Sequence, residues 1–291
     1  MDNQKIIAFL NTLDLSVHKH ASNIVTKFGN WSSLKPTQQK ALPIIANEYF
    51  NFINENNRIV GYSNQDIIDR TNLLNKYYDF INTNQYDNVF TAQGKFRPTI
   101  LEEFMYILFK DLINEEKINL EDADNNLRIG NTRAYTNLFF SGSNFHEFVK
   151  SPQIGINNKD QDFAIYRPIN ITIGASNSIS TNLPIVAIEN KTFIDKTMLE
   201  GSIATAEKIK SGNPYSLFFI VVENYDVDLK VDPIYSKINQ IYVLRKSRRA
   251  TRPIQPICSN VLIDLVTEVK RHLGRNWSDV SAKLSKTGKI L

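Results

Sequence analysis

The sequence predicts an α/β protein, closer to the α+β kind, with a mixed central sheet flanked by helices and a helical N-terminal region. Three observations predict it. Apolar residues recur at helical spacing through the first 95 residues, short β-like runs begin near residue 134, and a strand–helix–strand unit spans 184–222. We therefore expect a helical region at 1–95 and a second domain at 96–291 that contains the sheet and ends in helices.

The N-terminal region is expected to be built from helices. Apolar residues at three- and four-residue steps predict helices at 5–10, 41–53 and 67–81, and a polar segment at 82–88 closes this part. The next helix is predicted at 96–113, because Pro98 and Thr99 form a start signal and a single apolar face follows them.

The β-like runs carry the predicted sheet. They lie at 135–140, 162–166, 184–188 and 216–222, and the sequences SerGlySerAsn and AsnAsnLys are expected to form turns between some of them. A helix is predicted at 197–210, with Thr197 and Glu200 as a capping box. A crossover of this length predicts a parallel pair of strands. Two further helices are expected near 259–273 and 277–285.

Composition limits the class of protein. The chain has 291 residues, 42% of them hydrophobic, which is enough for a folded core. A single cysteine, Cys258, excludes an internal disulfide and a cysteine-based zinc site and fits a reducing, cytoplasmic location. No apolar run is long enough to span a membrane, and no Gly-rich Walker loop indicates ATP binding. The net charge of +4 is compatible with a polyanionic partner.

One pattern points to chemistry. Asp162 leads an apolar run, and Glu189-Asn190-Lys191 closes another. Alternation along a strand places Glu189 and Lys191 on one face, about 6–7 Å apart, and pairing of the two runs would bring Asp162 to them. Two carboxylates can hold Mg²⁺, with the Asn190 carbonyl as a further ligand, and an ammonium beside them suits phosphodiester hydrolysis. Asp160 could replace Asp162 as a ligand, since the two share a face.

The same residues have a simpler interpretation. An Asp near a turn and a Glu-x-Lys triplet at a strand end occur by chance in many proteins as solvated ends and surface ion pairs. The strand–helix–strand unit that follows Lys191 favours the catalytic interpretation, because it supplies the scaffold that such a site needs.

Longer blocks carry a resemblance to a known family. They are PheArgProThrIleLeuGluGluPhe at 96–104, LysAspGlnAspPheAlaIle at 159–165, GluAsnLysThrPheIleAspLysThrMetLeuGlu at 189–200 and IleTyrValLeuArgLys at 241–246. Through them the stretch 96–246 resembles type II restriction endonucleases of the PD-(D/E)xK superfamily, and more narrowly the Bpu10I family. The resemblance implies a Mg²⁺-dependent nuclease with an α/β core that cuts double-stranded DNA at a short specific sequence.

The resemblance also assigns roles to residues. It implies metal ligation by Asp162 and Glu189 and a catalytic ammonium at Lys191. The proline that usually precedes the acidic residue is replaced by Gln161. Glu102 and Glu103 match a position where some members carry an auxiliary acidic residue. Placement in the first turn of a helix, where acids favour the helix dipole, explains them equally well.

A basic cluster follows the last predicted strand. Arginines here can bind phosphates and read guanine edges in the major groove, although a solvated basic loop is the alternative. The cluster consists of Arg245, Lys246, Arg248, Arg249 and Arg252.

We therefore expect a type II site-specific deoxyribonuclease. One candidate site per chain requires two chains for a double-strand cut, and a homodimer suits a palindromic site. The resembled family also includes pairs of unlike, related subunits, and residues 1–95 would grip DNA or contact a subunit. The alternatives are a DNA-binding protein without catalysis and a structure-specific or nicking nuclease that acts with a partner subunit.

Overall fold

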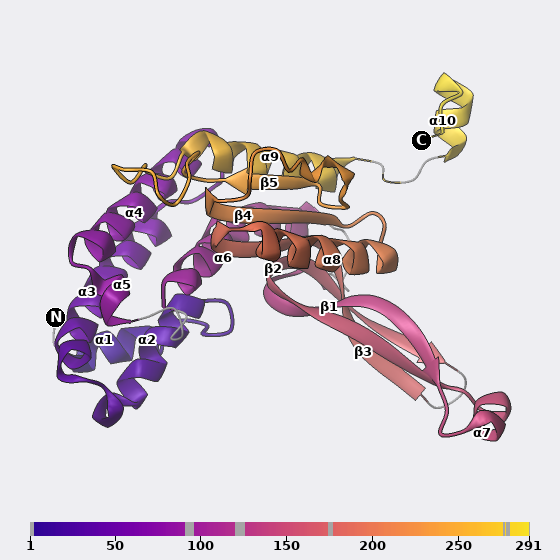
Figure 1. Ribbon diagram of the computed structural model, residues 1–291, viewed down its shortest axis with the longest axis horizontal. Helices are drawn as coiled ribbons and strands as arrows, with labels where there is room; N and C mark the ends of the chain where they lie inside the picture. Colours follow the sequence, from indigo (N-terminus) through magenta and orange to yellow (C-terminus); the bar gives the residue numbers. More distant parts are fainter. Residues whose placement is uncertain are drawn as a thin grey trace.

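Five strands form one mixed sheet in the described part of the computed structural model, which covers residues 3–90, 96–119, 126–173, 177–275, 277 and 280–290 (Figure 1). Their order is β1-β2-β3-β4-β5, with antiparallel pairing of β2 to both β1 and β3 and parallel pairing of β4 to both β3 and β5. The strands are β1 (Arg128–Ser141), β2 (Gln153–Ile173), β3 (Asn177–Ile194), β4 (Leu217–Tyr225) and β5 (Gln240–Val243). The predicted mixed sheet and its parallel crossover are confirmed.

Helices surround this sheet and make up the N-terminal region. The first five α-helices are α1 (Asn3–Leu10), α2 (Lys19–Gly29), α3 (Pro36–Arg58), α4 (Asn64–Thr83) and α5 (Tyr86–Val89). The others are α6 (Phe96–Asn119), α7 (Phe145–Lys150), α8 (Lys196–Gly212), α9 (Ser259–Gly274) and α10 (Val280–Thr287), and short 3₁₀ turns lie at Trp31–Ser33 and Pro233–Tyr235. None of these described helices is both long and apolar enough to cross a membrane.

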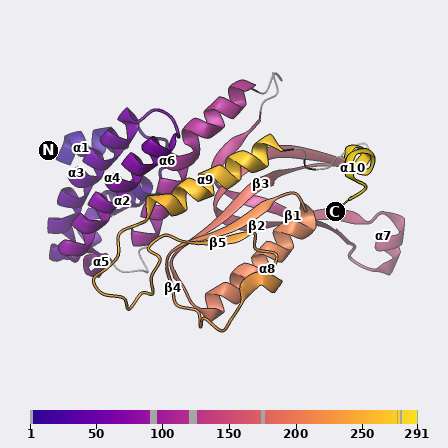
Figure 2. The same ribbon diagram turned by 90° about the horizontal axis from the view of Figure 1, so that it is seen from above.

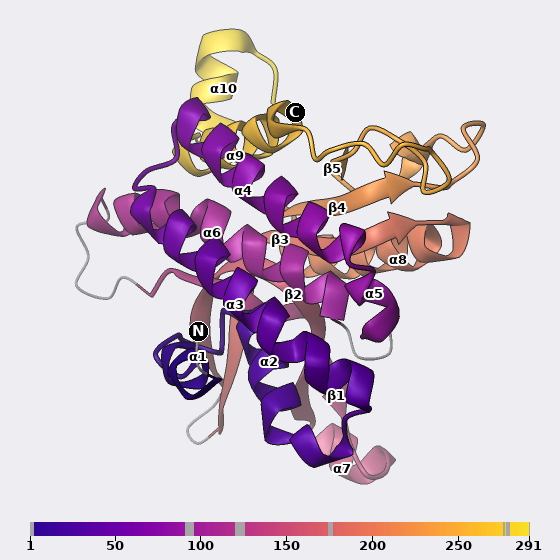
Figure 3. The ribbon, with the colours of Figure 1, turned by 90° about the vertical axis from the view of Figure 1, so that its left-hand side faces the viewer.

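The two faces of the sheet bury different cores. Val186 and Ile188 of β3 belong to a core shared with α6, α9 and the N-terminal helices. Ala187, which points the other way, belongs to a smaller core under α8. Figure 2 shows α9 lying between α4 and β5, and Figure 3 shows α2, α3 and α4 beside α6. One continuous core joins the N-terminal helices to the sheet, and the boundary near residue 95 stays a prediction.

Strands β1, β2 and β3 extend beyond the core as a ribbon that carries α7 at its tip (Figure 1). The predicted AsnAsnLys turn at 157–159 is wrong, because β2 runs straight through it. Asn157 and Asn158 pair with Asn137 and Tyr135 of β1, so cross-strand hydrogen bonding overrides the local preference of asparagine for turns.

The start of α8 also differs from the prediction. Thr197 is not the capping residue; Asp195 is, and its carboxylate accepts a hydrogen bond of 2.8 Å from the Met198 amide. Because β3 continues to Ile194, the first residue able to cap the helix is Asp195, and α8 begins directly after it. This short connection ties the helix to the end of the strand that carries Glu189 and Lys191.

Candidate functional site

The candidate catalytic residues lie where β2 and β3 run antiparallel. Phe163 pairs with Ile188, so one further step of the register places Asp162 opposite Glu189 on one face. Asp162 is tied to β3, because its Oδ2 accepts a hydrogen bond of 2.8 Å from the Asn190 amide. The structure thus brings Asp162, Glu189 and Lys191 together on one face of β2 and β3, a site that we call the catalytic edge.

Charge at the catalytic edge is only partly compensated. Lys191 Nζ lies 2.9 Å from Glu189 Oε1, and the two side chains are 32% and 21% exposed. The second carboxylate oxygen of Glu189, Oε2, is buried without a hydrogen-bond donor from the described residues. Burial alone would lower the pKa of Lys191, but Glu189 and then Asp162 raise it above its ordinary value. The edge therefore offers a carboxylate oxygen with unused capacity to bind a cation.

Asp160, the alternative ligand, has a different environment. Its carboxylate is 87% exposed and lies 3.6 Å from Arg133 Nε on β1, directly across the ladder. Asp162 is half-buried and fixed to the backbone of β3. A side chain that is already held at the edge loses less entropy on binding a metal, which favours Asp162.

Asn190 contributes its backbone to this arrangement. Its amide bonds Asp162, while its side-chain oxygen and nitrogen are both buried without a hydrogen-bond partner among the described residues. Alternation directs that side chain away from Glu189 and Lys191. Its carbonyl as a metal ligand stays a prediction.

Glu102 and Glu103, which are neighbours on α6, have different environments. The charge of Glu102 adds to those of Glu189 and Asp162 in raising the pKa of Lys191. Glu103 points into the interior, where its Oε2 accepts hydrogen bonds from the His20 and Ala21 amides at the start of α2. These interior hydrogen bonds account for Glu103 without chemistry, and its auxiliary role stays a prediction. The helix-dipole explanation fails for both residues, because α6 begins at Phe96 and neither lies in its first turn.

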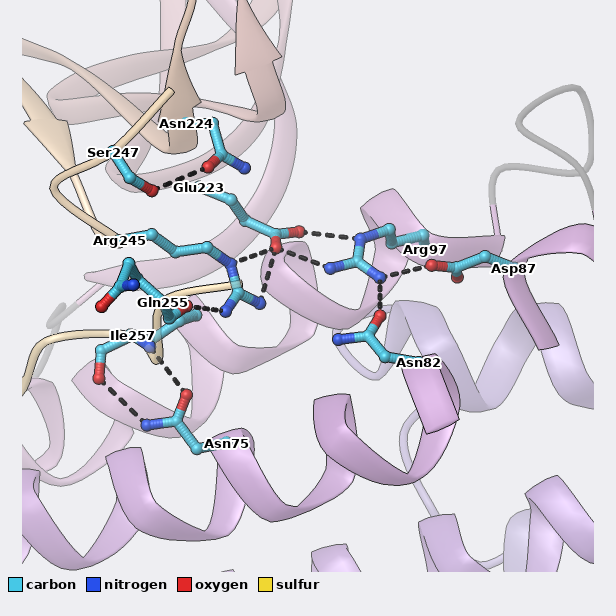
Figure 4. A network of polar contacts seen from close by, with 10 residues as sticks. All are labelled: Asn75, Asn82, Asp87, Arg97, Glu223, Asn224, Arg245, Ser247, Gln255 and Ile257. Carbon is cyan, nitrogen blue, oxygen red and sulfur yellow. Dashed lines mark hydrogen bonds and ion pairs between the residues drawn. The ribbon is translucent and has the colours of Figure 1, made fainter. Parts of the chain in front are cut away.

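The basic cluster also divides. Arg245 is 3% exposed, its Nε donates to Glu223 Oε2 at 2.9 Å, and it also bonds the Gln255 carbonyl (Figure 4). The Arg245 guanidinium therefore binds within the protein interior, which does not favour a DNA contact, and that contact stays a prediction. The remaining members are exposed: Lys246, Arg248, Arg249 and Arg252.

Glu223 lies between two guanidinium groups. Arg97 Nη2 donates to its Oε2 at 2.7 Å from one side, and Arg245 donates from the other. Arg97 also bonds Asp87, and the ring of Tyr78 lies 4.8 Å from the Arg97 guanidinium. We call Arg97, Glu223 and Arg245 the buried clamp. In the sequence, the buried clamp is visible only as a charged residue at the end of the apolar run 217–222. Its three residues lie too far apart along the chain for their contacts to be predicted without the fold.

A pocket of about 370 Å³ adjoins the clamp at the ends of β3 and β4. The N-terminal helices, α6 and both strands contribute to it, and so does the segment 244–258 between β5 and α9, which carries the basic cluster and which we call the basic loop. Its lining includes Asn82, Arg97, Thr192, Phe193, Glu223, Asn224, Arg249 and Arg252. Thr192 and Phe193, the two residues that follow Lys191 on β3, line the pocket together with residues of the basic loop.

The catalytic edge suits Mg²⁺ better than a metal that needs a complete protein cage. Among the described residues no three His, Cys, Asp or Glu side chains gather to hold a metal. Mg²⁺ commonly takes one or two carboxylates and keeps several waters. Asp162 and the unpartnered Oε2 of Glu189 match that donor set.

Comparison with known proteins identifies the family. A family model described as Bpu10I restriction endonuclease matches residues 93–261. A solved structure titled "native BbvCI A2B2 tetramer at low resolution" superposes with a TM-score of 0.67, covering 88% of this chain and 94% of that chain at 20% identity. No curated protein matches. At that identity the structural likeness shows the fold, whereas the family model covers more than half of the chain. The chain therefore belongs to the Bpu10I restriction endonuclease family, whose activity is site-specific hydrolysis of DNA.

Proposed function

We propose that this chain is a type II restriction endonuclease that hydrolyses phosphodiester bonds in double-stranded DNA at a short specific sequence, with Mg²⁺ as cofactor. One observation carries the proposal: two carboxylates and an ammonium share one face of the sheet on β2 and β3, and one carboxylate oxygen lacks a hydrogen-bond partner among the described residues. Most buried carboxylate oxygens in proteins have a hydrogen-bond partner, so an oxygen left without one beside a second carboxylate and an ammonium supports metal binding here.

Each residue has a distinct role in this proposal. Asp162, Glu189 and the Asn190 carbonyl hold the metal, which when bound polarises the phosphate and lowers the pKa of a bound water. Lys191 places positive charge where the attacking water and the phosphate oxygens meet and stabilises the negative charge that develops there. Glu102, from α6, adjusts the charge around Lys191. Lys246, Arg248, Arg249 and Arg252 bind the DNA backbone or bases.

Cutting both strands requires two catalytic edges, and the described residues of one chain supply one. The sequence favours a homodimer. The similar BbvCI structure is an A2B2 tetramer by its title, and this supports the alternative of a related second subunit that cuts the other strand. Residues 1–95 would serve DNA grip or subunit contact.

The test is cleavage of a large bacteriophage DNA and of a supercoiled plasmid by the full chain, with Mg²⁺ or with EDTA. Glu189→Gln and the matched exposed control Asp160→Asn are assayed beside it. Discrete fragments that need Mg²⁺ and Glu189, but not Asp160, support the proposal, and nicked plasmid alone indicates a missing related subunit. Intact DNA with tight binding that is indifferent to metal would favour a DNA-binding protein without catalysis, and cutting only at junctions a structure-specific nuclease.

A further inference from the structure

We propose that Arg249, with Asn224 beside it, reads a base edge next to the phosphate that is cut, and so determines sequence specificity. This inference rests on the proposed function and extends it to particular residues. The pocket at the ends of β3 and β4 holds both side chains.

Arg249 and Asn224 lie near the end of β3 that carries Lys191. Phe193 lies two residues beyond Lys191 on β3, about 6–7 Å along the strand. Asn224 pairs in register with Phe193 across the parallel β3–β4 ladder. The Arg249 guanidinium lies 4.4 Å from the centre of the Phe193 ring. Since successive base pairs are about 3.4 Å apart along DNA, a base contacted from here lies within a few base pairs of a phosphate held at Lys191.

Two contacts orient Arg249. The backbone amide of Arg249 donates a 2.9 Å hydrogen bond to Asp226 Oδ1, and stacking on Phe193 fixes the plane of the guanidinium. No hydrogen bond or ion pair to the side chain of Arg249 comes from the described part of the chain. The guanidinium donors of Arg249 are thus held in place and have no hydrogen-bond partner among the described residues. Their forked arrangement matches the O6 and N7 acceptors of guanine in the major groove.

The side-chain amide of Asn224 offers a second donor beside Arg249. Asn224 Oδ1 accepts a 3.2 Å hydrogen bond from Ser247 Oγ, which orients the amide and leaves its nitrogen as a donor (Figure 4). Purine bases offer acceptors in the major groove, and a donor here complements them. Ser247 belongs to the basic loop, so Asn224 also connects this loop to the end of β4.

Hydrogen bonds from other elements hold the basic loop that carries Arg249. Arg245 and Asn75 anchor the basic loop on either side of its turn, Arg245 through Glu223 and the Gln255 carbonyl, Asn75 through two hydrogen bonds to Ile257. Figure 4 shows these anchors and Arg97 converging from separate elements. The pocket therefore has a preformed, charged floor instead of a freely moving loop. Contacts held this way discriminate between bases better than contacts from a mobile side chain.

The test uses a library of randomised DNA duplexes and the full-length protein. Wild type, Arg249→Lys, Arg249→Ala and Asn224→Ala are compared with Arg248→Ala, an exposed arginine of the same loop. Duplexes nicked or cut with Mg²⁺ are sequenced, and duplexes bound by the same variants in a Glu189→Gln background are sequenced in parallel. Thermal unfolding checks that each variant is folded, and the conservative lysine variant keeps the charge.

We expect Arg249→Lys and Arg249→Ala to lose preference at one defined base pair by roughly 10- to 100-fold, and Arg248→Ala to weaken binding evenly across all sequences. Unchanged base preference in both pools, with only a uniform loss of binding, would overturn the inference and make Arg249 a phosphate contact. Failure of wild type to cut any duplex would count against the proposed function alone, because the bound pool still reports base preference.

Discussion

The catalytic edge and the buried clamp both contain ion pairs between carboxylates and cationic side chains. They differ in how many hydrogen-bond donors each carboxylate has. Glu223 is 1% exposed and receives hydrogen bonds from Arg97 and Arg245. Glu189 is 21% exposed, pairs with Lys191 alone, and has an oxygen without a donor among the described residues. The two sites lie only a few residues apart on the neighbouring strands β3 and β4.

The difference separates residues that stabilise the fold from residues that await a ligand. A buried carboxylate with donors on both sides holds elements together, and losing one partner leaves an uncompensated charge. A carboxylate with unused capacity contributes little to the fold and can bind a metal. Substitution should therefore affect stability at the clamp and activity at the edge.

The largest expected effect is on activity at the catalytic edge. Glu189→Gln keeps the shape of the side chain but removes the charge that would hold Mg²⁺. We expect Mg²⁺-dependent cleavage to fall roughly 1,000-fold or more, while the free energy of unfolding changes by less than about 1 kcal/mol. Cleavage rates on a plasmid and urea unfolding measure the two quantities. A variant that unfolds early but still cuts would reverse the assignment of this site.

At the clamp the expected effect is on stability. Glu223→Ala leaves Arg97 and Arg245 buried without their shared carboxylate, which costs about 3–5 kcal/mol. Urea unfolding measures this loss, and Glu200→Ala, an exposed glutamate whose pairing with Lys196 spans 3.9 Å, is the control. A Glu223 variant as stable as wild type would show that the clamp is not what holds the basic loop.

The sequence was sufficient for the catalytic edge but not for the clamp, and the reason is distance along the chain. Asp162, Glu189 and Lys191 lie on adjacent strands, so strand periodicity and one pairing bring them together. Arg97 and Glu223 are 126 residues apart and meet only because α6 packs near the end of β4. Arg245 and Arg249 look alike in the sequence, and the fold buries the first and exposes the second. Composition of a basic run does not report the burial of its members.

A third buried network predicts how stability depends on pH. Burial lowers the pKa of His20 to about 4, although the charge of Glu103 opposes this. The unfolded chain binds a proton near pH 6.5 and the folded chain only near pH 4, so stability is full above about 6.5 and falls on acidification. We expect a loss of about 1.4 kcal/mol between pH 7.5 and 5.5 from this residue. His20→Gln should flatten that part of the curve; an unchanged slope in urea unfolding would place the effect elsewhere.

The smallest change in cleavage rate is expected at Glu102, and its neighbour Glu103 on α6 provides the contrast. The charge of Glu102 helps to raise the pKa of Lys191, whereas Glu103 caps α2 and accepts a 2.6 Å hydrogen bond from the Tyr49 hydroxyl. Glu102→Gln should lower the cleavage rate about fivefold with unfolding unchanged, because it only adjusts the charge around Lys191. Glu103→Gln should instead lower the free energy of unfolding by about 2 kcal/mol with little effect on the rate of the folded enzyme.

These two variants form a matched pair, because the same substitution is made at neighbouring positions of one helix. Rate and stability are measured for both at a temperature where each is folded. If Glu102→Gln lowers stability as much as Glu103→Gln does, the side chain of Glu102 belongs to the packing of α6 and not to the catalytic edge. A lower rate without lower stability would extend the catalytic edge from β2 and β3 to α6, making that helix part of the site as well as of the core.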